Sequence, residues 1–223
     1  MALAFWLPYR RQFAIARCWA RILFWVLEHL CGLKYVVEGR EHIPPGNHIV
    51  MSNHTSAWET IAQFLIFPPQ VWVLKRELLW IPFVGWGLKR LRPIAINRGE
   101  GHRAVNQVIE QGKERLADGL WIIIFPEGTR VLAGETRKYG VSGALLAIAS
   151  GKCVVPLAHN AGAFWRRRGF MKRPGTIRVV SGEPILPVGQ DPRELNERVR
   201  QSIDAGLARI AISSSTADTG DAR

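Results

Sequence analysis

The chain has 223 residues, 48% hydrophobic and 22% charged, so it is long enough to bury one substantial core and too apolar to be disordered throughout. It carries 30 Lys and Arg against 18 Asp and Glu, a net charge of +12, which indicates an anionic partner such as phospholipid headgroups, nucleotide phosphates, an acidic protein or nucleic acid. Its three cysteines form no C-x-x-C pair, which excludes a disulfide scaffold and a Cys-rich zinc module.

Residues 1–38 differ from the rest of the chain because arginines interrupt an aromatic and aliphatic composition. On a helical wheel, Arg10, Arg17, Arg21 and Glu28 fall within about 40° of one another, beside a wide apolar surface. No stretch of about 18 residues lacks a charge, which disfavours a spanning helix, and the N-terminus lacks the cationic region of a signal peptide. We expect an amphipathic, membrane-associated helical segment. The alternative is a helix packed on its own domain.

A second basic stretch, residues 166–178, contains several cations and no acidic residue. Phe170 and Met171 lie among these cations, and this combination indicates a loop that contacts an anionic membrane surface. A solvated basic loop is the alternative. RNA binding would also use such a patch, but it usually brings a recognisable module, so we expect no nucleic-acid partner.

From residue 39 onward, apolar runs typical of strands alternate with amphipathic helical patterns. Strands are expected at 48–51, 71–75, 93–97, 120–125, 152–157 and 176–181, and helices at 56–67, 101–117, 140–150 and 191–212. This alternation predicts an α/β domain over residues 39–212, with a largely parallel mixed sheet flanked by helices. Residues 213–223 have nothing to bury, and we expect a disordered tail there.

The end of the first expected strand carries groups suited to acid–base chemistry. His54 follows this strand, and Glu59 lies on the helix after the turn. A carboxylate bonded to one ring nitrogen orients a neutral imidazole and makes the other nitrogen more basic. The pattern Ser56-x-x-Glu59 is also a helix-capping box, so a structural role for Glu59 is the alternative.

Other strand ends carry cations. Arg98 follows the strand at 93–97, Arg130 follows the turn after the strand at 120–125, and Lys75 ends the strand at 71–75. Because loops at the carboxyl ends of parallel strands gather at one edge, these cations predict a phosphate-binding pocket. A tight turn with a surface Arg is the alternative. The chain has no nucleophile elbow, Walker loop or dinucleotide fingerprint, and its histidines lack ligand spacing, so we expect no metal or redox cofactor.

Four motifs resemble, in order, the four blocks of the glycerolipid acyltransferases, and most nearly the bacterial 1-acyl-glycerol-3-phosphate acyltransferases. They are Asn-His-Thr-Ser-Ala-Trp-Glu at 53–59, Ile-Ala-Ile-Asn-Arg at 94–98, Phe-Pro-Glu-Gly-Thr-Arg at 125–130 and Val-Val-Pro-Leu at 154–157. The resemblance implies transfer of a fatty acyl group from acyl-CoA or acyl carrier protein to the 2-hydroxyl of a lysophospholipid acceptor, lysophosphatidic acid. The product is phosphatidic acid, made without a cofactor at the cytoplasmic face of the bacterial inner membrane.

The resemblance also implies residue roles. His54 would be the general base and Glu59, where the family more often has Asp, would orient it. Arg98 would bind the acceptor phosphate, and Pro156 would shape the acyl-chain side. The third block would help bind the acceptor through Glu127, Gly128, Thr129 and Arg130. Two positions of the second block depart from the usual Gly and Asp, and these are Arg92 and Asn97.

Other functions stay open on these residues. The acceptor could instead be glycerol 3-phosphate or a lyso-ornithine lipid, and the same base could activate water in a thioesterase. A non-enzymatic alternative is a basic peripheral protein that binds anionic membranes or RNA by charge. That protein would show salt-sensitive binding independent of His54.

Overall fold

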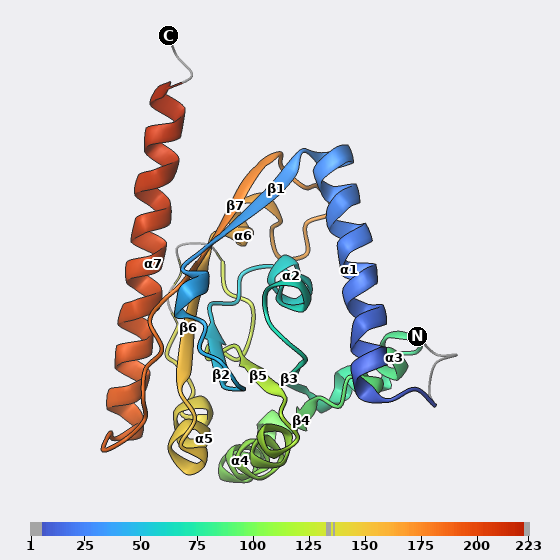
Figure 1. Ribbon diagram of the computed structural model, residues 1–223, viewed down its shortest axis with the longest axis vertical. Helices are drawn as coiled ribbons and strands as arrows, with labels where there is room; N and C mark the ends of the chain where they lie inside the picture. The colour runs from blue at the N-terminus through green and yellow to red at the C-terminus, as the bar shows by residue number, and fades with distance from the viewer. Residues whose placement is uncertain (1–5, 133–134, 136, 221–223) are drawn as a thin grey trace.

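The computed structural model describes residues 6–132, 135 and 137–220, which form a seven-stranded sheet with helices on both faces (Figure 1). The strand order is β1-β7-β6-β2-β5-β3-β4, and only the β6–β7 pair is antiparallel. The strands are β1 Leu33–Glu38, β2 Ile49–Ser52, β3 Gln70–Lys75, β4 Ile94–Ile96, β5 Trp121–Ile124, β6 Val154–His159 and β7 Gly175–Ser181. The expected α/β fold with a largely parallel mixed sheet is confirmed.

Seven helices and three short 3-10 turns connect these strands within the described residues. The helices are α1 Tyr9–Cys31, α2 Trp58–Ile66, α3 Val84–Arg90, α4 His102–Ala117, α5 Ser142–Ser150, α6 Ala161–Phe164 and α7 Pro192–Gly220. The 3-10 turns are η2 Arg40–His42, η3 Arg76–Trp80 and η4 Arg98–Glu100. Most of the elements lie where the sequence predicts them, with boundaries shifted by one or two residues.

Strand side chains alternate between two apolar cores. Val50 of β2 and Ile123 of β5 pack with α1 and α2 on one face, whereas Ile49, Met51 and Ile122 pack with α4, α5 and α7 on the other. Side chains of successive strand residues point to opposite faces, so a strand covered on both faces is apolar throughout. The central strands β2 and β5 are accordingly buried along their whole length.

The first 38 residues are not one helical segment. Helix α1 ends at Gly32, which adopts a left-handed conformation with φ 62° and donates its N–H to Glu28, and the chain then turns into β1. Strand β1 lies at the sheet edge, parallel to β7. Its residues alternate between Leu33, which is buried, and Lys34, which is exposed, because only one face of this strand meets the core.

Helix α1 has a buried face and an exposed apolar face. Phe13, Ala16 and Phe24 are buried against the domain, as the alternative of a packed helix predicts. Trp19 and Trp25 on the opposite side are 52% and 60% exposed. Within residues 6–132, 135 and 137–220, no helix combines the length and apolarity needed to cross a membrane. Membrane association of this segment stays a prediction.

The C-terminal helix extends further than expected. Helix α7 continues past Ile212 to Gly220, so residues 213–220 are helical rather than a disordered tail. No Gly or Pro interrupts residues 213–219, and the Ser213 hydroxyl donates to the Arg209 carbonyl, as a side chain on a continuing helix does. Residues 221–223 lie outside the described part of the chain.

Candidate active site

His54 and Glu59 form a hydrogen-bonded pair at the carboxyl end of β2. The chain leaves this buried strand through a short turn that carries His54, and Glu59 lies in the first turn of α2. The His54 Nδ1 lies 2.7 Å from Glu59 Oε1. An ionised carboxylate can accept hydrogen bonds but cannot donate them, so His54 Nδ1 carries the ring hydrogen. The other ring nitrogen, Nε2, keeps a free lone pair. The pair contains a base but no covalent nucleophile.

The Glu59 carboxylate serves both roles that the sequence left open. The same Oε1 also accepts the N–H groups of Thr55 at 3.0 Å and Ser56 at 2.8 Å, so it fixes the start of α2 as well as the imidazole. Its side chain is only 1% exposed. Burial by itself raises the pKa of Glu59, but the two neighbouring imidazoles and the Ser56 N–H outweigh burial, so the pKa lies below its ordinary value and the carboxylate stays ionised.

The main chain of His54 is tied to the turn after β5. Its N–H donates to Glu127 Oε1 at 3.3 Å, and its carbonyl accepts the Val131 N–H at 2.9 Å. Its ring stacks on Phe125, with centroids 4.0 Å apart and an interplanar angle of 14°. The first and third motifs therefore form one structural unit. Within it, the side chain of His54 is 14% exposed.

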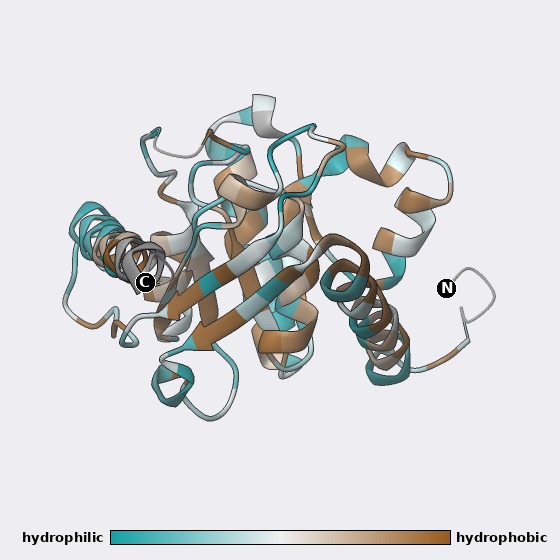
Figure 2. Ribbon diagram, turned by 90° about the horizontal axis from the view of Figure 1, so that it is seen from above, coloured by the Kyte–Doolittle hydropathy of each residue, from teal (hydrophilic) through white to brown (hydrophobic). Residues whose placement is uncertain are grey.

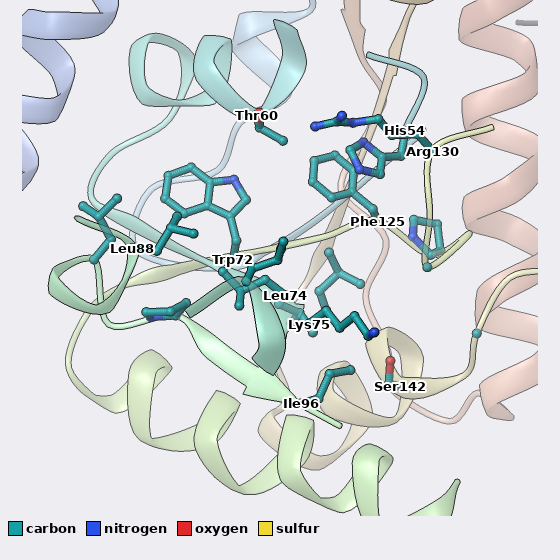
Figure 3. Close-up of a pocket in the computed structure, with 18 of the residues that line it drawn as sticks. His54, Thr60, Trp72, Leu74, Lys75, Leu88, Ile96, Phe125, Arg130 and Ser142 are labelled. Carbon is teal, nitrogen blue, oxygen red and sulfur yellow. The ribbon is translucent and has the colours of Figure 1, made fainter. Parts of the chain in front are cut away.

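A cavity of about 680 Å³ opens beside this pair. Figure 3 shows His54, Phe125 and Arg130 at one end of it and Trp72 and Leu88 at the other. Most of its lining is apolar and comes from β3, α2, α3 and α4, with Trp19 of α1 at its edge. A mostly apolar cavity with a few convergent polar groups is typical of a site for an amphiphilic ligand.

Two of the expected cations line the cavity. Arg130 is half-buried and lines the cavity, and its Nε is buried with no hydrogen-bond partner among the described residues. Lys75, at the end of β3, pairs with Glu77 at 2.9 Å and its side chain is 48% exposed. Arg130 is therefore the better placed of the two to bind an anion.

The backbone of Arg98 lies at the edge of the cavity, as its neighbours in the chain show. It begins η4 between Ile96 and Gly101, which both line the cavity. Its side chain lies outside the part of the structure that is described. The structure therefore brings the backbone of the second motif to the same cavity as His54 and Arg130.

The two departures in the second motif have local structural explanations. Arg92 has φ 49°, a left-handed conformation that explains why Gly is usual there, and its guanidinium pairs with Asp118. The Asn97 side chain accepts the Gly99 N–H at 3.2 Å, a capping role that an Asp fills equally well. Neither residue is among those lining the cavity.

Glu127 lines a second cavity, of about 230 Å³, and is not among the residues that line the main cavity. Its Oε1 accepts the His54 N–H. Burial raises the pKa of Glu127 to about 7. Gly128 has φ 70°, which closes the turn through its N–H bond to Phe125, and Thr129 is half-buried in the same turn. These contacts therefore do not favour direct binding of an acceptor by Glu127.

Pro156 is buried in β6 and paired with Met51 of β2, and it lines neither of the two cavities. In the sheet order, β2 and β5 separate β6 from β3 and β4, which border the main cavity. The expected role of Pro156 on the acyl-chain side stays a prediction.

The sequence did not assign roles to three residues that complete the site. Phe125 supports the His54 ring, and Asn53 joins His159 through two hydrogen bonds of 3.0 Å. Asn53 and Phe125 each begin one of the motifs and His159 follows the fourth motif by two residues, and these positions were the available signal. Among the described residues, no group of three or more His, Cys, Asp or Glu is arranged to hold a metal.

Comparison with known proteins identifies the family. The sequence model of the Acyltransferase family matches residues 34–160, more than half of the chain. The chain belongs to the acyltransferase family. The resemblance of the four motifs is confirmed, as is the expectation of an enzyme.

Individual relatives agree with this assignment. The chain is 41% identical over 209 residues to a 1-acyl-sn-glycerol-3-phosphate acyltransferase of Pseudomonas aeruginosa, covering 92% of this chain and 81% of the relative. It is 33% identical to a Borreliella burgdorferi protein of the same name, covering 91% and 82%. The crystal structure of the 1-acyl-sn-glycerophosphate (LPA) acyltransferase PlsC from Thermotoga maritima superposes with a TM-score of 0.75 at 25% identity, covering 89% and 79%.

Proposed function

We propose that the protein is a 1-acyl-sn-glycerol-3-phosphate O-acyltransferase. It would transfer a fatty acyl group from acyl-CoA or acyl carrier protein to the 2-hydroxyl of lysophosphatidic acid, giving phosphatidic acid. The observation that carries the proposal is that the base of a buried His–Glu pair and a cation, Arg130, line one apolar cavity of about 680 Å³. The printed names of the Pseudomonas and Thermotoga relatives support the same substrate.

His54 supplies the base. Its Nε2 accepts the proton of the acceptor hydroxyl as the oxygen attacks the thioester carbonyl, and Glu59 stabilises the imidazolium that forms. The tetrahedral intermediate then expels the thiolate, which takes the proton back from Nε2. No acyl-enzyme is needed, because one oxygen–carbon bond forms and one sulfur–carbon bond breaks on the substrates themselves.

The cavity supplies the positioning. Arg130, with Arg98 on the rim, would hold the acceptor phosphate, while the apolar stretch from Phe125 to Trp72 would hold the acyl chain. Lys75 is a further cation on the same wall. Gly128 and Thr129 would shape the turn that presents Arg130, and Glu127 would hold the main chain of His54.

The test is an assay with purified protein in mixed micelles. It offers radiolabelled acyl-CoA or acyl carrier protein with lysophosphatidic acid, glycerol 3-phosphate or a lyso-ornithine lipid, and it measures labelled lipid products. Phosphatidic acid as the main product supports the proposal. Labelled free fatty acid without acceptor would identify a thioesterase, and a preference for another acceptor would reassign the substrate.

We further propose that the enzyme works on an anionic membrane surface facing the cytoplasm. The proposed contact surface is an apolar rim of six exposed side chains, of which Trp19 also lines the cavity. They are Trp19, Ile22 and Trp25 of α1, Trp80 of η3, Phe83 in the turn before α3, and Trp86 of α3. Figure 2 shows α1 and α3 on the same side of the sheet, both carrying hydrophobic residues. The cationic stretch at 166–173 and exposed Phe170 would add contacts with headgroups and acyl chains. The three free thiols suit a reducing compartment.

Vesicle flotation tests this surface. We expect the protein to float with phosphatidylglycerol-containing vesicles and less with phosphatidylcholine vesicles. Replacement of Phe83 and Trp86 by Ser should weaken flotation, whereas replacement of exposed Ile148 on α5 should not. Equal flotation of both variants would contradict the assignment of the rim.

A further inference from the structure

The end of β6 and the start of α6 are bonded to the segment that carries His54. The Asn53 side chain donates to the carbonyl of His159, the last residue of β6, and accepts the His159 N–H, both at 3.0 Å. The His159 Nε2 lies 2.7 Å from the Asn53 carbonyl oxygen. Beyond His54, the Thr55 hydroxyl accepts the N–H of Gly162 in α6 at 3.1 Å. These two elements therefore hold the residues on both sides of the base.

The His159 ring has one defined tautomer. The Asn53 carbonyl only accepts hydrogen bonds, so Nε2 carries the hydrogen, and Nδ1 accepts the Ala161 N–H at 3.3 Å. The side chain is 0% exposed, and burial lowers its pKa, so the ring is neutral. A fully buried, neutral imidazole with both nitrogens bonded acts on its neighbours rather than on a substrate.

The same ring lies beside the second oxygen of the carboxylate. His159 Nε2 is 4.0 Å from Glu59 Oε2, which has no hydrogen-bond partner among the described residues. At this distance there is no hydrogen bond, but the Nε2–H dipole lies close to the carboxylate in a buried site. His159 thus touches the peptide that leads into His54 and borders the carboxylate that orients it.

The two segments approach closely. A Cβ placed on Gly162 would lie 2.8 Å from the Thr55 Cβ, so glycine lets α6 pack against the loop. Three hydrogen bonds between Asn53 and His159 restrain the peptide that joins Asn53 to His54. This peptide sets the starting point of the His54 side chain, whose ring is then held by Glu59 and Phe125.

We propose that His159 is a positioning residue for acyl transfer, whose Nε2–H holds the Asn53 carbonyl and thereby aims the His54 imidazole at Glu59 and at the cavity. This inference rests on the proposed function. Misplacement of a catalytic group by about 1 Å reduces the rate on the order of a hundredfold. His159 therefore affects the turnover step and leaves substrate binding unchanged.

Two polar variants of similar size test this assignment. A Gln amide nitrogen reaches the position of Nε2, whereas an Asn side chain is too short, so we expect H159Q to keep kcat within about threefold and H159N to lose at least about tenfold. KM for both substrates should stay within twofold in each variant. H48L is the matched control, because it removes an imidazole–carbonyl contact of 3.0 Å at the amino end of β2. Equal kcat values for H159Q and H159N, or a rise in KM that accounts for the loss, would overturn the assignment.

Amide hydrogen exchange provides a readout that does not require activity. In H159N, the Thr55 and Ser56 amides, which donate to Glu59, should exchange at least about tenfold faster, while the Ile122 amide in β5 stays protected. H159Q should retain protection at Thr55 and Ser56. If the wild-type protein forms no phosphatidic acid, the proposed function fails while exchange still decides the role of His159. Unchanged exchange at Thr55 and Ser56 in H159N would overturn that role.

Discussion

The corner formed by His54 and Glu59 and the apolar rim are built by different forces. In the corner, a single, buried carboxylate oxygen of Glu59 receives three hydrogen bonds of 2.7 to 3.0 Å. In the rim, the side chains of Trp80 and Phe83 are 70% and 78% exposed. Hydrogen bonds fix atoms in one geometry, whereas apolar burial depends on area and tolerates movement. This difference is why we propose acyl transfer at the corner and lipid contact at the rim.

Removal of the base should have the largest effect. We expect His54→Ala to reduce kcat by about 10³-fold or more while the protein remains folded, because general base catalysis contributes on the order of 10² to 10⁴. Initial rates of phosphatidic acid formation, with circular dichroism as the folding control, measure this. A rate within tenfold of wild type would remove His54 from the mechanism, whereas a serine at Trp86 of the rim should leave the micellar kcat unchanged.

Loss of the charge on Glu59 should have the next largest effect. Glu59→Gln keeps an oxygen that accepts the Ser56 N–H but no longer stabilises an imidazolium, so we expect kcat to fall about 10²-fold with little change in helix stability. Thermal unfolding and kcat measured on the same sample separate the two roles. A loss of stability with normal kcat would indicate that Glu59 only caps α2.

Arg130 lines the cavity at the same end as His54, and its loss should act on binding. We expect Arg130→Ala to raise KM for lysophosphatidic acid about ten- to hundredfold, the magnitude of a charge-assisted hydrogen bond. Lys75→Ala is the matched comparison on the same cavity wall and should change KM less than about threefold, because Lys75 is half-exposed and paired with Glu77. Equal effects of the two substitutions would contradict the placement of the phosphate at Arg130.

Glu127 predicts a smaller, pH-dependent effect on stability. Its folded pKa of about 7 lies above the ordinary value of 4.5, so the folded state binds the proton more tightly than the unfolded state. The stabilisation from the protonated carboxyl is therefore present below about pH 4.5 and is lost as the pH rises toward 7. Glu127→Gln should not show this loss, and its free energy of unfolding should exceed that of wild type by up to about 3 kcal/mol at pH 8 and by little at pH 5. Urea unfolding of both proteins at pH 5 and pH 8 measures the difference in their free energies of unfolding. The same difference at both pH values would contradict the raised pKa of Glu127.

The sequence predicted the His54–Glu59 pair better than the residues packed around it. The His54–Glu59 contact depends on one strand, one turn and one helix start, all of which are local in sequence. The His159–Asn53 contacts join segments 106 residues apart and depend on β6 lying next to β2. Strand order is set by packing of all the helices at once, and local patterns do not contain it.

Strand β1 and helix α3 were missed for local reasons, and the single-turn helix α6 was not predicted either. Strand β1 was included in the N-terminal helical segment because its short alternation follows a long helix directly. Helix α3 contains Gly85 and Gly87, which lower helix propensity. The structure explains the first of these glycines, because a Cβ at Gly85 would lie 2.2 Å from the Leu79 carbonyl oxygen. Close packing against η3 therefore favours a residue that weakens the sequence signal.

The central claim is direct transfer from thioester to acceptor by His54 in the cavity, and rapid-quench measurement of thiol release tests it most directly. With labelled acyl thioester, the wild-type enzyme should release thiol only after lysophosphatidic acid is added, in equal amount to phosphatidic acid. Enzyme carrying Ala at position 54 should bind the donor and release neither product. Thiol release at the same rate without acceptor, with label on the protein or in free fatty acid, would contradict the account.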